Sequence, residues 1–265
     1  MSLLAYLEPG EPFPSTDLAL DEPNGLLAAG GILDTATLLA AYERGIFPWF
    51  EPPQPVLWWS PDPRSVLRPD ELHLSRSLRK TLRKNPFKIR VDTAFEAVVE
   101  ACAAPRDGQR GTWISDRMLE AYSGLHSAGF AHSVEAYNPS GILVGGLYGV
   151  RLGGAFFGES MFARETDASK AAFTALAWNL VNMGATLIDC QIESEHLNSL
   201  GAVAISRVDF EERLAQTVPM SVDESLWRAP TSCSSMLEDL LPLLNNRNSP
   251  APAVATPSDT GSVEG

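Results

Sequence analysis

The fold of this chain is decided by Gly158-Glu159-Ser160-Met161-Phe162 and Leu187-Ile188-Asp189-Cys190-Gln191, with a helical stretch between them that ends at Gly184. Both segments read as buried strands, yet each contains polar side chains that could carry chemistry. In a strand with a period of two, Asp189 and Gln191 share one face. A buried carboxylate and a buried amide are costly unless they are paired or used. The pair therefore predicts either a hydrogen-bond network that only fixes the fold or a site of chemistry.

The residues around this helical stretch predict an ordered series of elements. The predicted strands are 130–137, 142–150, 155–161 and 186–191. The helix before the last strand is predicted over 168–183, with Thr166 or Asp167 as its cap and Gly184 at its end. An antiparallel meander, a helix and a further strand form the core order of the acyl-CoA N-acyltransferase (GNAT-like) fold. This order alone does not establish acyl transfer.

Length and composition predict an α+β protein in two parts. A chain of 265 residues, 45% of them hydrophobic, has room for a sizeable core. Residues 1–64 are rich in Pro, Gly and Trp and predict a small N-terminal accessory α/β domain with a helix over 35–44. Residues 65–232 predict the GNAT-like domain, with further helices over 94–103 and 116–127. Residues 246–265, rich in Pro, Ser, Ala and Thr, predict a disordered tail.

The sequence predicts a soluble cytoplasmic protein without a metal site. Cys102, Cys190 and Cys233 are odd in number and widely spaced, which favours neither a disulfide framework nor a zinc site. Residues 1–10 lack the basic segment and apolar run of a secretory signal. No apolar stretch approaches the roughly 18 residues that span a bilayer.

Positive charge gathers in one short segment of an otherwise acidic chain. The net charge of −13 argues against a nucleic-acid partner, but residues 73–90 contain seven Lys and Arg residues and no Asp or Glu. Leucines recur every four residues from Leu74 to Leu82, so 74–84 is predicted as an amphipathic helix. A helix face of one sign indicates a phosphate-rich partner rather than a merely solvated face. The cations expected to contact phosphates are Arg76, Arg79, Lys80, Arg83 and Lys84.

Further motifs, spread over residues 6–210, make the chain resemble the leucyl/phenylalanyl-tRNA–protein transferase family. These motifs are Leu26–Gly31, Gly45-Ile46-Phe47-Pro48-Trp49-Phe50, Trp58-Trp59-Ser60-Pro61, Thr112-Trp113-Ile114, Ala131-His132-Ser133-Val134-Glu135 and Gly145-Gly146-Leu147-Tyr148-Gly149. The resemblance implies an accessory domain followed by a GNAT-like catalytic domain. It implies transfer of Leu or Phe, and sometimes Met, from tRNA to the α-amine of proteins that begin with Arg or Lys. The product enters the N-degron pathway of proteolysis.

The same resemblance implies the substrates and the lack of a cofactor. The donors are leucyl-tRNA and phenylalanyl-tRNA, and the acceptors are proteins with an N-terminal Arg or Lys. No metal, nucleotide or acyl-CoA is expected, because the aminoacyl ester is already activated. In agreement, no pyrophosphate-binding glycine turn precedes the 168–183 helix.

The resemblance also assigns roles to the polar residues of the two strands. Asp189 and Gln191 are the expected catalytic pair, and Glu159 is expected to bind the cationic end of the acceptor, which a carboxylate suits. An aspartate with a pKa near 4 is a poor base unless burial raises it. We therefore expect Asp189 to orient and polarise Gln191, whose amide oxygen holds a hydrogen of the attacking amine.

Apolar and aromatic residues complete the expected site. Met161, Phe173 and Ile188 match the family's aminoacyl pocket, and a methionine suits a pocket that accepts both branched and aromatic shapes. Trp49 and Trp113 are expected to stack the terminal adenosine or to form a wall of the pocket. Ordinary packing is the alternative reading for all five. His132 and His196 are interpreted as satisfied core or turn histidines rather than as bases.

Two other functions stay open on the residues. The first is an acyl-CoA acetyltransferase, against which the missing pyrophosphate turn counts. The second is a non-catalytic RNA-binding module built around the helix in 73–90, in which Glu159, Asp189 and Gln191 would have no chemical role.

Overall fold

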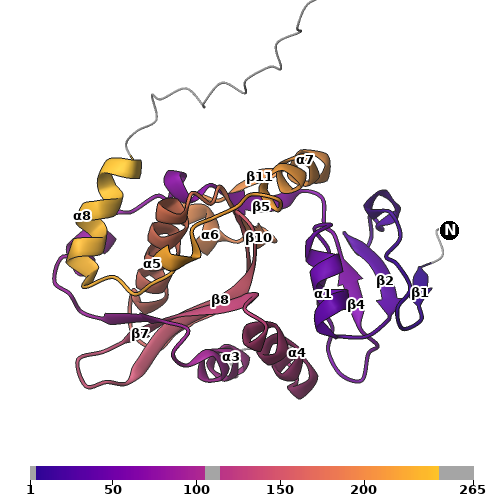
Figure 1. Ribbon diagram of the computed structural model, residues 1–265, viewed down its shortest axis with the longest axis horizontal. Helices are drawn as coiled ribbons and strands as arrows, with labels where there is room; N and C mark the ends of the chain where they lie inside the picture. The colour runs from indigo at the N-terminus through magenta and orange to yellow at the C-terminus, as the bar shows by residue number, and fades with distance from the viewer. Residues whose placement is uncertain (1–3, 105–113, 245–265) are drawn as a thin grey trace, which may run out of the picture.

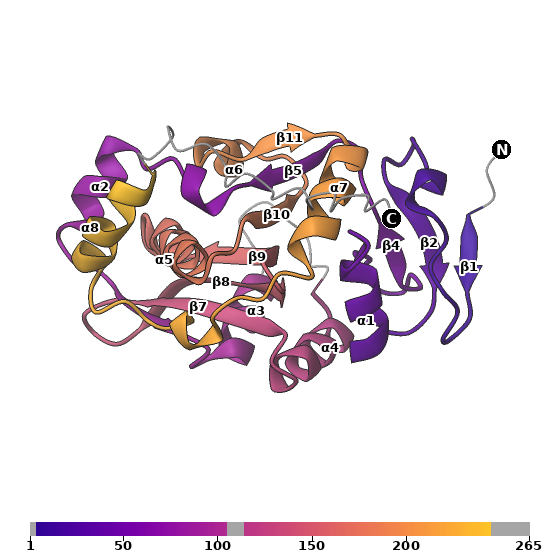
Figure 2. The same cartoon turned by 45° about the horizontal axis from the view of Figure 1, so that its top comes forward.

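Two β-sheets lie side by side along the long axis of the computed structural model, which describes residues 4–104 and 114–244 (Figure 1). The smaller sheet has the order β1-β2-β4-β3. Its strands are β1 (Ala5–Leu7), β2 (Leu26–Gly30), β3 (Phe47–Pro48) and β4 (Leu57–Trp59). Helix α1 (Thr35–Tyr42) packs between this sheet and the rest of the molecule, and Asp34 caps it by accepting a hydrogen bond of 2.7 Å from the Thr37 amide (Figure 2).

The larger sheet has seven strands in the order β11-β5-β10-β9-β8-β7-β6. These strands are β5 (Arg64–Leu67), β6 (Lys88–Val91), β7 (Ala131–Tyr137), β8 (Leu143–Leu152), β9 (Ala155–Ala163), β10 (Leu187–Gln191) and β11 (Val203–Ile205). All neighbouring strands are antiparallel except β9 and β10, which are parallel because α5 (Ala168–Met183) connects them as a crossover. The predicted order of meander, helix and further strand is confirmed.

Helices cover both faces of the larger sheet (Figure 1). On one face, α5 lies with α2 (Arg76–Leu82) and α8 (Cys233–Leu244) over a core that includes Phe173 and Ile188. On the other face, α3 (Phe95–Ala103) and α4 (Asp116–Ser127) share a core with the small sheet. This shared core fixes the small sheet against the end of the large one. The remaining helical segments are η1 (Thr16–Leu18), η2 (Pro69–Glu71), α6 (Glu195–Ser199), α7 (Arg207–Thr217) and η3 (Glu224–Leu226).

Helix α5 has the predicted bounds, and its two ends have distinct causes. Gly184 ends it with a φ of 79°, a conformation that costs glycine little. At the other end, Asp167 is the cap residue, but its side chain accepts no capping hydrogen bond from a backbone N–H of the first turn. The Asp167 carboxylate instead accepts a hydrogen bond from the Thr81 hydroxyl (3.1 Å) and lies 3.4 Å from the Lys170 ammonium. Lys170 can therefore occupy the first turn of the helix, where the dipole alone disfavours a cation.

Some sequence predictions concern segments that the structure does not describe or describes differently. The expected tail over 246–265 and Trp113 lie outside the described residues. Strands β6 and β11 and helices α7 and α8 were not predicted. Within residues 4–104 and 114–244, no helix combines the length and the apolar character that crossing a membrane requires.

Candidate active site

A cavity of about 360 Å³ opens where β9 and β10 separate. Backbone pairing between these parallel strands runs from Leu187 with Ala155 to Asp189 with Phe157 and then stops. Beyond this point the strands line the cavity from two sides, with Gly158 to Met161 on β9 and Cys190 to Gln191 on β10. The polar residues singled out in the sequence therefore meet at one place in the fold.

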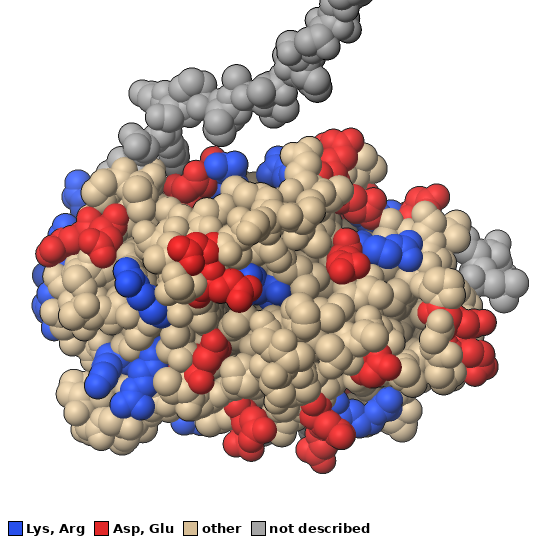
Figure 3. Space-filling model, in the orientation of Figure 1, with Lys and Arg blue, Asp and Glu red and all other residues tan. Residues whose placement is uncertain are grey.

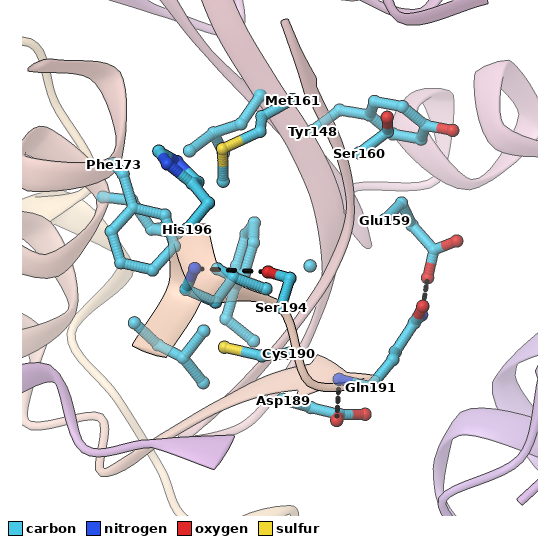
Figure 4. A pocket seen from close by; sticks show the side chains of 16 residues that line it. Tyr148, Glu159, Ser160, Met161, Phe173, Asp189, Cys190, Gln191, Ser194 and His196 are labelled. Atoms are coloured by element: carbon cyan, nitrogen blue, oxygen red, sulfur yellow. Dashed lines mark hydrogen bonds between the residues drawn. The ribbon is translucent and has the colours of Figure 1, made fainter. Parts of the chain in front are cut away.

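The interior of the cavity is largely apolar. Met161, Phe173 and Ile188 all line it, so the three residues expected to form the aminoacyl pocket are brought together (Figure 4). The other apolar lining residues, none of which the sequence analysis assigned to this pocket, are Leu147, Phe156, Leu176 and Leu197. Such a cavity can take a branched or aromatic side chain.

Two β-bulges aim the polar side chains at each other. In β9, Ser160 pairs with Tyr148 and Gly158 pairs with Gly149, which leaves Glu159 as the extra residue. In β10, a second register shift falls between Asp189 and Gln191. A bulge re-aims the side chains beside it. The Gln191 Nε2 donates a hydrogen bond of 3.0 Å to the Glu159 Oε1, and both residues line the cavity (Figure 4).

The bulge in β10 changes the expected relation between Asp189 and Gln191. Regular alternation would place both side chains on one face, but Gln191 has a φ of 61° and the alternation ends at Asp189. The Asp189 Oδ1 accepts a hydrogen bond of 2.8 Å from the backbone N–H of Gln191, not from its side-chain amide. Asp189 is therefore placed to orient Gln191 through the main chain.

Glu159 is buried in a hydrogen-bond network of tyrosines. The Tyr42 hydroxyl donates to its Oε1 and the Tyr122 hydroxyl donates to its Oε2, each at 2.7 Å. Burial raises the pKa of the Glu159 carboxyl to about 7, although the two tyrosine hydroxyls work against this rise; the negative charge of Asp189 adds to it. Burial and the charge of Glu159 in turn raise the pKa values of Tyr42 and Tyr122. The tyrosines thus stay neutral donors around a carboxyl that titrates near neutrality.

We expect the charge of Glu159 to make stability depend on pH. The pKa of this carboxyl is about 7 when folded and about 4.3 when unfolded. Between these pH values the folded protein holds a proton that the unfolded chain has lost, so the free energy of unfolding falls as pH rises through this window. The fall is on the order of 3 kcal/mol. Urea unfolding between about pH 5 and about pH 8 should therefore show a flatter curve for Glu159→Gln than for the unmodified protein.

The control for this experiment is the exposed Glu165. Glu165→Gln should keep the pH dependence of the unmodified protein. An equally steep curve for Glu159→Gln would show that other groups cause the dependence.

The carboxylate of Asp189 is paired with Arg64, a residue that the sequence analysis missed. The Arg64 Nε donates to Oδ1 at 2.8 Å and its NH2 donates to Oδ2 at 2.6 Å, and both side chains are 0% exposed. The guanidinium lies over the rings of Phe47 and Phe210, with its Cζ 4.8 Å and 4.6 Å from the two ring centroids. Tyr42 and Tyr122 were missed as well, since nothing local in the sequence sets Arg64 or these two tyrosines apart.

Trp49 lies apart from the cavity lining. It follows β3 on the small sheet, is 41% exposed, and packs against Trp59 with 5.4 Å between ring centroids. The Trp59 Nε1–H donates to the Trp49 backbone carbonyl at 2.6 Å, which orients the Trp59 ring that the Trp49 ring packs against. An exposed, fixed indole can stack a base.

Both His132 and His196 have a buried Nε2 with no hydrogen-bond partner among the described residues, but only His196 lines the cavity. His132 is bonded through Nδ1 to Asp92 at 2.8 Å, away from the cavity. Burial and the charge of Lys170 lower the pKa of His196. The interpretation of His196 as a satisfied turn histidine is therefore not what the structure shows.

No group of three or more His, Cys, Asp or Glu side chains in the described part of the chain is placed to hold a metal ion.

The predicted basic helix is present as α2 and is amphipathic. Leu78 and Leu82 are buried, and Ser75 caps the helix by accepting a hydrogen bond of 3.2 Å from the Leu78 amide. The exposed cations of this segment are Arg76, Lys80, Arg83 and Lys84. Arg79 is half-buried, and its Nε donates to the Leu74 carbonyl at 2.9 Å. On the face shown in Figure 3, Lys and Arg gather at the end of the molecule that holds α2 and α8.

The fold and the site together define a GNAT-like domain with an accessory N-terminal sheet. The meander, α5 and the parallel strand β10 supply the domain, and the cavity lies where its two parallel strands separate. The polar lining of the cavity includes the amide of Gln191 and the carboxyl of Glu159.

Comparison with known proteins identifies the family. The family described as leucyl/phenylalanyl-tRNA protein transferase matches residues 66–215, and the N-terminal domain of the same family matches residues 31–62. The leucyl/phenylalanyl-tRNA–protein transferase of Nitrosomonas europaea is 56% identical over 216 residues, which cover 82% of this chain and 91% of that protein. The one of Pseudomonas entomophila is 57% identical over 204 residues, which cover 77% and 90%. The chain belongs to the leucyl/phenylalanyl-tRNA–protein transferase family.

A solved structure, L-PGS from Bacillus licheniformis, is also similar at low level. It aligns with 82% of this chain and 71% of its own, at 11% identity and a TM-score of 0.36. A similarity this weak carries no argument about function.

Proposed function

We propose that this protein transfers Leu or Phe, and less often Met, from aminoacyl-tRNA to the α-amine of proteins that begin with Arg or Lys. The observation that carries the proposal is the Gln191–Glu159 hydrogen bond in the lining of a largely apolar cavity, in a chain of this family. The donors are leucyl-tRNA and phenylalanyl-tRNA, and the product is a substrate for N-degron proteolysis in the cytoplasm. No cofactor is required, because the aminoacyl ester is already activated.

The reaction needs positioning more than it needs a strong base. An α-amine has a pKa of roughly 7.7–8.0, so on the order of a tenth is neutral at pH 7. The amine nitrogen attacks the ester carbonyl carbon, the bond from that carbon to the ribose oxygen breaks, and the amine's proton ends on the leaving hydroxyl. Positioning the amine on the carbonyl and stabilising the tetrahedral oxyanion are the larger demands.

Gln191 is the proposed group that positions the amine. Its Nε2 is engaged by Glu159, which leaves the amide Oε1 to accept a hydrogen from the attacking amine. Asp189 acts with Gln191, and the hydrogen bond from the backbone N–H of Gln191 to the Asp189 Oδ1 supports this role. Met161, Phe173 and Ile188 take the leucyl or phenylalanyl side chain.

Glu159 is the proposed partner of the acceptor's cationic side chain. A nearby guanidinium or ammonium favours the ionised carboxyl, so acceptor binding should draw the pKa of Glu159 down from about 7. Trp49 and Trp113 are proposed to contact the terminal adenosine, which the exposure of Trp49 supports.

The test uses purified protein, radiolabelled leucyl-tRNA and a peptide that begins with Arg. Label should reach this peptide and not a control peptide of the same sequence that begins with Gly. Absence of label on the Arg peptide would exclude the proposed activity.

The α2 helix is proposed to bind tRNA phosphates, and this predicts a change in salt dependence. Replacing Arg76, Lys80 and Arg83 with Gln should weaken the binding of any tRNA about equally. Each lost contact should lower the slope of log K against log salt by about one at most. Fluorescence titration at several salt concentrations measures the slope. Arg213→Gln, at an exposed cation on α7, is the matched control; an unchanged slope in the triple variant would place the tRNA elsewhere.

A further inference from the structure

Three of the roughly four acceptor positions of the Asp189 carboxylate are occupied by groups of the protein itself. This carboxylate accepts two hydrogen bonds from Arg64, at 2.8 and 2.6 Å, and a third of 2.8 Å from the backbone N–H of Gln191. The side chain is 0% exposed. A carboxylate that is closed off from solvent and bonded to a guanidinium fork is poorly placed to take a proton from a substrate amine.

Arg64 is held in place from two distant parts of the chain. Phe47 comes from β3 of the small sheet and Phe210 from α7, and both rings make cation–π contacts with the guanidinium. The Phe210 ring also packs against Gly45, where a Cβ would lie only 2.5 Å from it. This close approach needs glycine and fixes the position of the ring. The position of the Arg64 guanidinium, which donates to Asp189, is therefore restricted by its packing.

The backbone conformation of Gln191 is strained, so it needs a stabilising contact from another residue. A φ of 61° is rare for a residue other than glycine and costs on the order of 1–3 kcal/mol. The hydrogen bond from the Gln191 N–H to Asp189 supplies such a contact. With this backbone conformation, the Gln191 side chain reaches Glu159 in the cavity lining (Figure 4).

We infer that Arg64 is a positioning residue for the transfer reaction: it locks the Asp189 carboxylate so that Asp189 fixes the left-handed backbone of Gln191. Asp189 then acts by geometry and not as a proton acceptor. This inference rests on the proposed function, because it concerns the same reaction. It assigns to the Arg64–Asp189 ion pair the positioning of the Gln191 side-chain amide.

The test compares two single replacements with their combination. Each single replacement removes one charge of the ion pair, and the double replacement removes both charges while allowing hydrogen bonds between the two new amides. Arg64→Gln and Asp189→Asn are matched, because the Gln Nε2 stands where the Arg Nε stands and an amide pair can form two parallel hydrogen bonds. Each single variant leaves one charged partner mismatched, so kcat should fall about 100-fold while KM for leucyl-tRNA stays within about threefold. The double variant should recover to within about tenfold of the unmodified kcat.

Three outcomes would overturn the inference. One is a folded double variant as slow as Asp189→Asn alone, which would mean that the charge of Asp189 acts in the reaction. Another is an unmodified kcat in Arg64→Gln. The third is an unmodified kcat in Arg64→Lys, which keeps the charge, tests the fork geometry and does not depend on the double variant folding.

Controls separate this inference from the proposed function. Arg68→Gln changes an exposed arginine, 47% accessible and paired with Asp70, and should leave kcat unchanged. The unmodified protein is assayed beside all variants: if it transfers no leucine to an Arg peptide, the proposed function fails, whereas a failed rescue beside an active unmodified protein rejects only the role of Arg64. Thermal unfolding and tRNA affinity are measured for every variant.

Discussion

Replacing Asp189 with alanine is expected to destabilise the protein by about 3–5 kcal/mol, the usual effect of removing one partner of a buried ion pair. The variant would leave the Arg64 guanidinium, which is 0% exposed, without its carboxylate. The two aromatic rings around Arg64 offer cation–π contact but no acceptor for its N–H groups. Urea unfolding followed by circular dichroism measures the loss.

An exposed ion pair in the same region supplies the control for Asp189→Ala. Arg68 and Asp70 are joined at 2.8 Å, but their side chains are 47% and 42% exposed. Asp70→Ala should therefore change the free energy of unfolding by no more than about 1 kcal/mol. An equally small change in Asp189→Ala would mean that Arg64 reaches solvent or another acceptor when its partner is removed.

A combined apolar replacement separates the ion pair's effect on stability from its effect on activity. Exchanging both Arg64 and Asp189 for apolar residues of similar volume should recover most of the stability, because no buried charge is left unpaired. Transfer should stay low, since no acceptor remains for the Gln191 N–H. The pair is thus expected to matter for the shape of the site more than for the stability of the fold.

The parts of this fold that follow from local sequence pattern were predictable. Helix α5 has its predicted bounds because it is a long apolar run closed by Gly184, and the three strands of the meander follow from alternation and turn residues. The apolar pocket was also predicted, but on family resemblance. Met161, Phe173 and Ile188 come from three different elements, and nothing in their spacing would have separated a pocket from ordinary core.

The parts that depend on contacts between distant segments were not predictable. Arg64 meets Asp189 across 125 positions, and Tyr42 meets Glu159 across 117. An arginine after a proline and a tyrosine at a helix end are unremarkable in a sequence. Regular alternation also failed at Gln191, because a bulge and a positive φ cannot be read from residue types that favour strands. The site is built at the places where the regular pattern ends.

Replacing Gln191 with alanine is expected to lower kcat for transfer by about 100- to 1,000-fold, the usual loss when one preorganised polar group is removed from a reaction centre. The amide oxygen that holds the amine would be absent, and Glu159 would keep its two tyrosine donors. Alanine bears the same left-handed penalty as glutamine, so the backbone cost cancels between the two proteins. Binding of leucyl-tRNA should stay within about twofold, because the apolar cavity is unchanged.

Three measurements on Gln191→Ala decide whether the glutamine acts in the chemical step. Steady-state transfer with saturating leucyl-tRNA reports kcat, single-turnover transfer reports the rate constant of the chemical step, and titration without acceptor reports donor affinity. Gln54→Ala, at an exposed loop glutamine whose Oε1 accepts a hydrogen bond from the Glu51 amide, should transfer leucine at the unmodified rate. Weak donor binding with normal turnover in Gln191→Ala would assign the residue to substrate capture. A large loss of kcat at unchanged affinity would instead support the proposed role of its side-chain amide in positioning the attacking amine.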